Sequence, residues 1–285
     1  MNETTIKNIF NELNIEITSI NSATNSFNSN VYIINSTGKK YVLKISNNKN
    51  KMITESKYMT YLSKYINTSK VLKTGTINDK NYIVMTFFEG ENKFDEEANL
   101  LSKEEIKNIG ILLAKLHSAP LIDIDNDSWV NYLTDALEKV QDVLKEVFKE
   151  DNDIIYNYLK NYINNKLRNN YKNSILHMDF RVGNLIFNKD IVGLIDMESM
   201  KNGDYVFDFV KMDRNFTKDN FNILLDGYES IRTLDNDFYE KLDFYSLFDS
   251  YTSLWWSASR NKIDTDFYKI NYDIVINYLG KLRSK

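Results

Sequence analysis

The sequence predicts an α+β protein with two lobes. The N-terminal lobe is expected to be a five-stranded antiparallel sheet with one inserted helix, and the C-terminal lobe to be mainly helical. Up to Gly90, short β-branched and aromatic runs alternate with turn residues, whereas apolar residues recur at helical spacing beyond it. The two parts also differ in charge, with +4 in residues 1–91 and −8 in residues 92–285. We place the lobes at residues 1–88 and 89–285, joined by a hinge at about residues 86–91.

The N-terminal lobe owes its predicted sheet to five short runs with strand-like composition. These lie at residues 15–20, 30–35, 40–45, 71–76 and 82–88. The second and third runs are joined as a hairpin by the turn Ser36-Thr37-Gly38-Lys39. The fourth and fifth runs are separated by Asn78-Asp79. Apolar spacing predicts helices at residues 4–14 and 52–65, the second of them inserted between strands.

The C-terminal lobe opens with a clearly marked helix over residues 102–118. Ser102 and Glu105 form a capping box at its start, and Pro120, the only proline, follows its end. Further helices are expected at residues 129–149, 153–171, 218–230, 236–259 and 266–282. Three short apolar runs within residues 175–198 predict a small set of strands.

The composition limits the chemistry that the chain can perform. With no cysteine, and with His117 and His177 as the only histidines, the sequence excludes disulfides, thiolate metal sites, a cysteine nucleophile and a multi-histidine metal centre. A metal would need oxygen ligands, which suits Mg²⁺. The net charge of −4, together with the lack of a long apolar run or a signal-peptide pattern, predicts a cytoplasmic protein that binds neither nucleic acid nor membrane. No obligate protein partner is evident.

One motif carries chemistry. His177-Met178-Asp179 followed by Asn184 fits the His-x-Asp-x-x-x-x-Asn spacing of the catalytic loop in phosphoryl-transfer enzymes. In that loop the aspartate accepts the proton of the attacking hydroxyl and the asparagine binds magnesium. Asp196 ends a later apolar run and would supply a second metal ligand. For each carboxylate the alternative is a solvated loop residue or a helix cap.

Phosphoryl transfer of this type also needs a strand lysine paired with a helix glutamate. Lys44 lies between apolar residues of a predicted strand, where an unpaired ammonium would be costly. Glu55 lies in the helix that follows. An edge-strand lysine and a surface glutamate are the alternative interpretation.

These motifs resemble those of the aminoglycoside phosphotransferase and choline kinase superfamily, the small-molecule relatives of the protein kinase fold. The resemblance spans nearly the whole chain. It rests on Lys44 and Glu55 and on the segments MTFFEGE (85–91), ILLAKLHSA (111–119), HMDFRVGN (177–184), LIDMES (194–199) and NGDYVFDFV (202–210).

The resemblance implies a bilobal protein-kinase-like fold. Residues 1–88 would bind the nucleotide, and residues 89–285 would carry the catalytic and acceptor-binding groups. The base of ATP or GTP would lie against the backbone of Thr86 and Phe88. The loop over the phosphates is expected at residues 21–30, without the glycines that often form such loops.

The same resemblance implies roles for the chemical groups. Asp179 would be the catalytic base, and Asn184 and Asp196 would hold Mg²⁺. Lys44, paired with Glu55, would orient the nucleotide phosphates.

Supporting roles follow for residues around the catalytic loop. His177 would hold this loop, and Asp208 would stabilise it. Glu198 would be a secondary metal ligand or a structural partner. Arg181 would contact phosphate or pair with a carboxylate. Met178 departs from the family, which usually has glycine at this position.

The acceptor is less constrained. The acidic C-terminal lobe favours a cation, and Asp235 and Asp237 are candidate contacts. Tyr251 and Trp255 are spaced to face one site, where they would stack on a sugar or cage a quaternary ammonium. A solvated acidic surface and a set of core aromatics are the alternative interpretations.

We therefore expect a Mg²⁺-dependent kinase acting on a small, hydroxylated, cationic substrate. An aminoglycoside-type antibiotic, and hence a role in antibiotic resistance, is the first hypothesis. A metabolic choline, ethanolamine or sugar kinase is the second, and a silent nucleotide-binding relative is the third. A protein kinase is disfavoured because no Asp-Phe-Gly lies at Asp196 and no Ala-Pro-Glu follows it.

Overall fold

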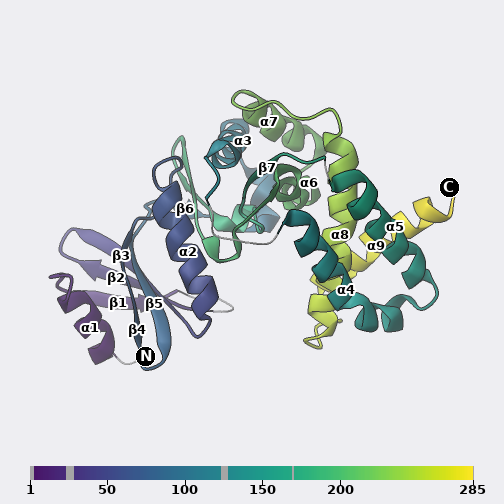
Figure 1. Ribbon diagram of the computed structural model, residues 1–285. Coiled ribbons are helices and arrows are strands. Elements are labelled where there is room, and N and C mark those ends of the chain that lie inside the picture. Colours follow the sequence, from purple (N-terminus) through teal and green to yellow (C-terminus); the bar gives the residue numbers. More distant parts are fainter. Residues whose placement is uncertain (1–2, 24–28, 123–127, 169, 285) are drawn as a thin grey trace. The chain divides into compact units, whose positions relative to one another are not determined.

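The computed structural model describes residues 3–23, 29–122, 128–168 and 170–284 (Figure 1). The chain forms two compact units. Unit 1 comprises Met1–Ala119, Asp179–Met200 and Asn215–Arg232, and unit 2 comprises Pro120–Met178, Lys201–Arg214 and Thr233–Lys285. The α+β class, with its five-stranded antiparallel sheet and mainly helical C-terminal part, is confirmed. The lobe boundary at residues 88 and 89 stays a prediction.

Unit 1 contains the five-stranded sheet, in the order β1-β2-β3-β5-β4. The strands are β1 Ser19–Ser22, β2 Asn30–Ser36, β3 Lys39–Ser46, β4 Val71–Ile77 and β5 Lys80–Thr86, and all neighbours are antiparallel. The first strand lies later than residues 15–20, where we expected it. Ile15 and Ile17 instead pack against the apolar core that includes Ile6, Ile9 and Phe10.

Two tight turns fix the register of this sheet. Gly38 adopts a φ of +72° between β2 and β3, and Asn78 and Asp79 adopt φ values of 48° and 59° between β4 and β5. Glycine, asparagine and aspartate tolerate this left-handed region best, which is why short hairpins favour them. Both predicted turns are confirmed.

The two faces of the sheet meet different helices. Leu43 and Ile45 of β3 belong to the core that α1 (Glu3–Asn11) covers with Ile6 and Phe10 (Figure 1). Because side chains alternate along a strand, Lys44 lies on the opposite face. There it meets α2 (Lys49–Leu62), which begins at the capping residue Asn48.

The rest of unit 1 combines short strands with two packed helices. These elements are β6 Glu91–Asn92, η1 Asp95–Leu100, α3 Lys103–Ser118, η3 Val182–Asn184, β8 Leu185–Asn188, β9 Ile191–Leu194, η4 Met197–Ser199 and α7 Lys218–Glu229. The predicted capping box of Ser102 and Glu105 is confirmed at the start of α3. Helices α3 and α7 approach closely, since a Cβ on Gly110 would lie 2.0 Å from the Leu224 carbonyl oxygen.

Unit 2 is mainly helical. Its elements are α4 Trp129–Phe148, α5 Asp151–Tyr162 with the π turn η2 Ile163–Leu167, β7 Asn173–Leu176, β10 Lys201–Asp204, η5 Tyr205–Phe209, α6 Val210–Asn215, α8 Phe238–Ala258 and α9 Asp266–Arg283. Strands β7 and β10 pair antiparallel. In the described part of the chain, every helix is too short or too polar to cross a membrane.

Candidate active site

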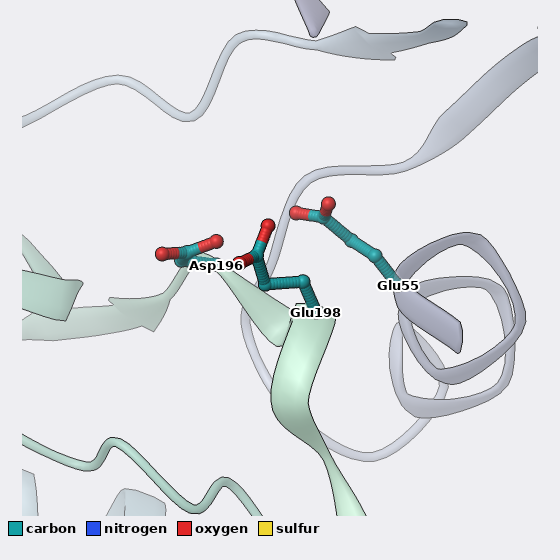
Figure 2. Close-up of side chains that lie close together, drawn as sticks. All are labelled: Glu55, Asp196 and Glu198. Atoms are coloured by element: carbon teal, nitrogen blue, oxygen red, sulfur yellow. The ribbon is translucent and has the colours of Figure 1, made fainter. Parts of the chain in front are cut away.

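Lys44 lies at the centre of three carboxylates. Its Nζ is 2.9 Å from Glu55 Oε2, 2.7 Å from Asp196 Oδ1 and 3.2 Å from Glu198 Oε2. Figure 2 shows the three carboxylates turned toward one another, Glu55 from α2 and the other two from the segment that follows β9. We call these four residues the Lys44 cluster. The predicted pairing of Lys44 with Glu55 is present, and Asp196 and Glu198 join it.

Burial and charge shape the protonation of the Lys44 cluster. Burial disfavours the charged form of Lys44, but the carboxylates of Glu55, Asp196 and Glu198 outweigh it and raise its pKa above the ordinary value. Burial also raises the pKa of Glu55 to about 7, although Lys44 acts in the opposite direction. Three carboxylates around one ammonium leave the cluster with an excess of negative charge.

A second lysine partly compensates this excess. Lys51, in the first turn of α2, places its Nζ 2.6 Å from Glu198 Oε1. Its side chain is 37% exposed, whereas that of Glu198 is 10% exposed. Lys51 was not predicted from the sequence, because only the fold brings it to Glu198.

The carboxylates of the Lys44 cluster fit a hard cation. Glu55, Asp196 and Glu198 each offer an oxygen, and these oxygens lie within 4.8 Å of one another. Oxygen-only donor sets suit Mg²⁺. The side chain of Asp196 is the most open of the three, at 42% exposure. We predicted Asn184 as the partner of Asp196, and that assignment stays a prediction.

The predicted catalytic loop is held by hydrogen bonds among its own residues. The Asn184 side-chain amide donates to Asp179 Oδ2 at 2.9 Å and to the Asp179 carbonyl at 2.8 Å. Because its NH₂ group is engaged there, the amide of Asn184 offers only its carbonyl oxygen to a ligand. Asn184 itself is buried.

Arg181 links this loop to a carboxylate far away in the sequence. Its Nε donates to Asp179 Oδ2 at 3.3 Å, and its Nη1 donates to Asp95 Oδ2 at 2.7 Å. Burial opposes the charged form of Arg181, but Asp179 and Asp95 outweigh it and raise its pKa. Of the two alternatives left open for Arg181, the structure shows the pairing with carboxylates. Asp95 was not predicted from the sequence.

Asp208 contacts the backbone just before Asp179. Its two carboxylate oxygens accept hydrogen bonds from the amides of His177, at 2.7 Å, and Met178, at 2.8 Å. Met178 has a φ of +69°, a conformation that favours the glycine usual in the family. The two hydrogen bonds help to hold this unfavourable backbone. Asp208 therefore makes the contacts expected of a residue that stabilises the loop.

The predicted hinge residues lie at the end of β5. The amide of Thr86 donates to the Lys70 carbonyl at 2.9 Å, and its hydroxyl accepts from the Lys70 amide. The Phe88 ring lies against Gly193 of β9, where a Cβ would come within 2.6 Å of it. Contact of Thr86 and Phe88 with a nucleotide base stays a prediction. Of the expected phosphate loop, residues 24–28 lie outside the described residues.

The predicted acceptor residues already have partners within unit 2. The Tyr251 ring is fully buried, and its hydroxyl donates to Asn152 Oδ1 at 2.6 Å. Burial leaves no face of this ring open for an acceptor, which counts against its predicted role. Trp255 is partly exposed, and the ammonium of Lys139 lies 4.7 Å from its ring centre.

The acidic candidates are also paired. Asp235 forms an ion pair with Lys172, and Asp237 Oδ2 lies 3.1 Å from Lys241 Nζ. A role in binding the acceptor stays a prediction for Trp255, Asp235 and Asp237.

Comparisons with known proteins agree with this geometry. A sequence model described as the phosphotransferase enzyme family matches residues 22–243. A search of curated proteins finds no significant match to this chain.

Several solved structures share the fold. The GDP complex of wild-type aminoglycoside 2′-phosphotransferase-IIIa has a TM-score of 0.73 at 14% identity and covers 98% of both chains. ADP-bound aminoglycoside phosphotransferase APH(2″)-Ib has a TM-score of 0.69 at 18% identity, covering 96% of this chain and 97% of its own. The gentamicin complex of APH(2″)-IIa has a TM-score of 0.66 at 19% identity, covering 98% of this chain and 96% of its own.

Proposed function

This chain belongs to the phosphotransferase enzyme family, and we propose that it is a Mg²⁺-dependent kinase for a small, hydroxylated, cationic molecule of the aminoglycoside class. ATP or GTP would be the donor. The observation that carries the proposal is the Lys44 cluster, in which a buried strand lysine faces three carboxylates. A location in the cytoplasm stays a prediction.

The nucleotide phosphates would bind at Lys44. Glu55 is almost completely buried and lies 2.9 Å from the Lys44 ammonium, so it fixes the direction of that side chain. Asp196 is the more exposed partner and contacts the same ammonium. In the loaded enzyme we expect Lys44 to keep Glu55 and to exchange part of its contact with Asp196 for phosphate oxygens.

The metal would be held by Asp196 and Asn184, with Glu198 nearby. Mg²⁺ bound there would neutralise charge on the β- and γ-phosphates. Asn184 supports this assignment because its amide nitrogen is engaged by Asp179, which leaves its oxygen as the group for a cation.

Asp179 would act as the base. The acceptor hydroxyl oxygen forms a bond to the γ-phosphorus, the bond from that phosphorus to the β,γ-bridging oxygen breaks, and the hydroxyl proton passes to the Asp179 carboxylate. Asn184 and Arg181 both donate to Asp179 Oδ2, so they orient the carboxylate. Most of the rate enhancement would come from positioning and charge neutralisation.

The acceptor class is supported by the relatives and by charge. The three solved structures described above are aminoglycoside phosphotransferases, and one of them holds gentamicin. Residues 92–285 carry a net charge of −8, which favours a polycationic alcohol. Such an acceptor would make the protein an antibiotic-resistance enzyme.

A panel of acceptors tests the proposal. Mg²⁺-dependent consumption of ATP and of GTP is measured with aminoglycosides, other hydroxylated antibiotics, choline, ethanolamine and simple sugars. We expect stimulation by an aminoglycoside, and its loss in Asp179→Asn. Asp190→Asn makes the same chemical change at an exposed turn residue and should keep full turnover. Stimulation by choline or a sugar alone would overturn the acceptor class, and full activity of Asp179→Asn would overturn the assigned base.

A further inference from the structure

We propose that Asp95 and Asn92, which follow the hinge segment, are positioning residues of the catalytic loop, and that Asp95 acts by drawing Arg181 away from the catalytic carboxylate. This inference rests on the proposed function, because it assumes that Asp179 is the base. Neither residue has the spacing of a recognised motif.

The peptide groups of Gly183 are bound from both sides by these side chains. The Asn92 amide donates to the Gly183 carbonyl at 3.0 Å and to the Leu185 carbonyl at 2.8 Å. Asp95 Oδ1 accepts the Gly183 amide at 2.9 Å. Two side chains from one short segment therefore hold the backbone that directly precedes and follows Asn184.

The second oxygen of Asp95 binds the side chain of the same loop. Asp95 Oδ2 accepts from Arg181 Nη1 at 2.7 Å, and the longer contact of Arg181, from Nε to Asp179 Oδ2, is 3.3 Å. A guanidinium next to a lone carboxylate tends to form two short parallel hydrogen bonds with it. Asp95 competes for the guanidinium, so that Asp179 receives a single, longer hydrogen bond from it.

Gly183 makes this arrangement possible. A Cβ at this position would lie 2.3 Å from Arg181 Nη1. A flexible side chain could usually move aside, but Arg181 is held by Asp95 and Asp179 at once. The position of Arg181 beside Asp95 therefore requires a residue without a side chain at Gly183.

A base that is fully paired with an arginine is a poor proton acceptor and is turned away from its substrate. Without the Asp95 charge, we expect Arg181 to pair fully with Asp179. This would lower kcat and leave nucleotide binding unchanged, because the Lys44 cluster is not altered. Removal of Arg181 should then make the charge of Asp95 unimportant.

The test combines kinetics with hydrogen exchange. In Asp95→Asn, kcat should fall by about tenfold to a hundredfold while the nucleotide KM stays within about twofold. Glu96→Gln, the same change at the exposed neighbour, should leave kcat unaltered. In an Arg181→Met background, Asp95→Asn should change kcat by less than about twofold. An unchanged kcat in Asp95→Asn, or an equal loss in both backgrounds, would overturn the proposal.

Amide exchange supplies a readout that needs no turnover. The Gly183 amide should exchange faster in Asp95→Ala than in the wild type, and equal protection would overturn the proposal. If no acceptor supports turnover of the wild-type chain, the proposed function fails, and the exchange of Gly183 still decides whether Asp95 holds the loop.

Discussion

Two lysines are buried among the described residues, and their surroundings differ. Lys44 of unit 1 faces Glu55, Asp196 and Glu198. Lys241 of unit 2, in α8, lies 3.1 Å from Asp237 and 3.7 Å from Asp204. Both satisfy the rule that a buried charge needs a partner.

The environment of Lys241 is closed. Asp204 is fully buried, accepts the Tyr245 hydroxyl at 3.0 Å and accepts the Val206 amide at 3.3 Å. The Trp129 indole donates to the same hydroxyl at 2.8 Å. Lys241 thus pairs with two carboxylates, and one of them, Asp204, is shielded from solvent and hydrogen-bonded to Tyr245.

A buried lysine paired with a carboxylate therefore does not by itself indicate a functional site. The Lys44 cluster differs in two ways: its negative charge exceeds the charge of Lys44, and the Asp196 side chain is 42% exposed. Excess charge and access are what a bound cation and phosphates require. The Lys241 network instead ties α8 to the segment that leads into η5.

Replacing Lys44 should give the largest effect on activity. Lys44→Met removes the ammonium that orients the phosphates, and we expect kcat/KM to fall by at least about a hundredfold. Steady-state kinetics measure the loss, and circular dichroism checks that the variant folds. Lys57→Met on the exposed face of α2 is the control. Wild-type kinetics in a folded Lys44→Met protein would contradict a role for Lys44 in orienting the phosphates.

Replacing Lys241 should give the largest effect on stability. Lys241→Met leaves Asp204 buried without its cation, and we expect the free energy of unfolding to fall by about 3–5 kcal/mol. The double variant Lys241→Met with Asp204→Asn should recover part of this loss. Urea denaturation measures both. An unchanged unfolding midpoint would show that this pair is not the structural tie we infer.

Much of the fold was predictable because its signals are local. The capping box at Ser102, the turn at Gly38 and the break at Asn78 each lie within a few residues of the element that they define. Strand β10 was missed because its residues, Lys201–Asp204, include no apolar side chain, whereas the equally short β8 and β9 were marked by apolar runs. The turn η5 that follows was missed as well.

In the candidate site, the residues that belong to sequence motifs were predictable, and those that only the fold brings together were not. Lys44 and Asp196 follow motif spacing and are indeed in contact. Lys51 and Asp95 were missed because their partners lie 147 and 86 residues away. Tyr251 was misleading because helical spacing does not distinguish a binding face from a core face, and its ring lies in the core.

Replacing Lys51 should have a smaller effect on activity than replacing Lys44. Lys51→Met removes the second cation that contacts Glu198. The excess negative charge of the Lys44 cluster is then less well compensated and should repel the nucleotide. We expect the nucleotide KM to rise about threefold to tenfold, while Lys51→Arg stays near the wild type. Because Lys51 is partly exposed, salt should screen its charge, and the difference in nucleotide KM should shrink at high salt. Equal nucleotide KM values for the Met and Arg variants would contradict this role.

The smallest predicted effect is a pH dependence that comes from Asp204. Burial raises the pKa of Asp204 from 3.8 to about 6 in the folded protein, although Lys241 opposes this. Between these values the folded state binds more protons than the unfolded state, so the contribution of Asp204 to stability falls as pH rises from about 4 to 6. Asp204→Asn should lose this part of the pH dependence. Unfolding midpoints at each pH check it, and parallel profiles for the two proteins would contradict it.

Calorimetry of nucleotide binding to the wild type and to Asp196→Asn, with Mg²⁺ or with a chelator, tests whether the Lys44 cluster binds a metal-bound nucleotide. We expect Mg²⁺ to strengthen binding of ATP or GTP to the wild type, and we expect Asp196→Asn to lose this gain. Equal affinity of the two proteins in the presence of Mg²⁺ would show that the exposed carboxylate of the Lys44 cluster does not serve a metal-bound nucleotide.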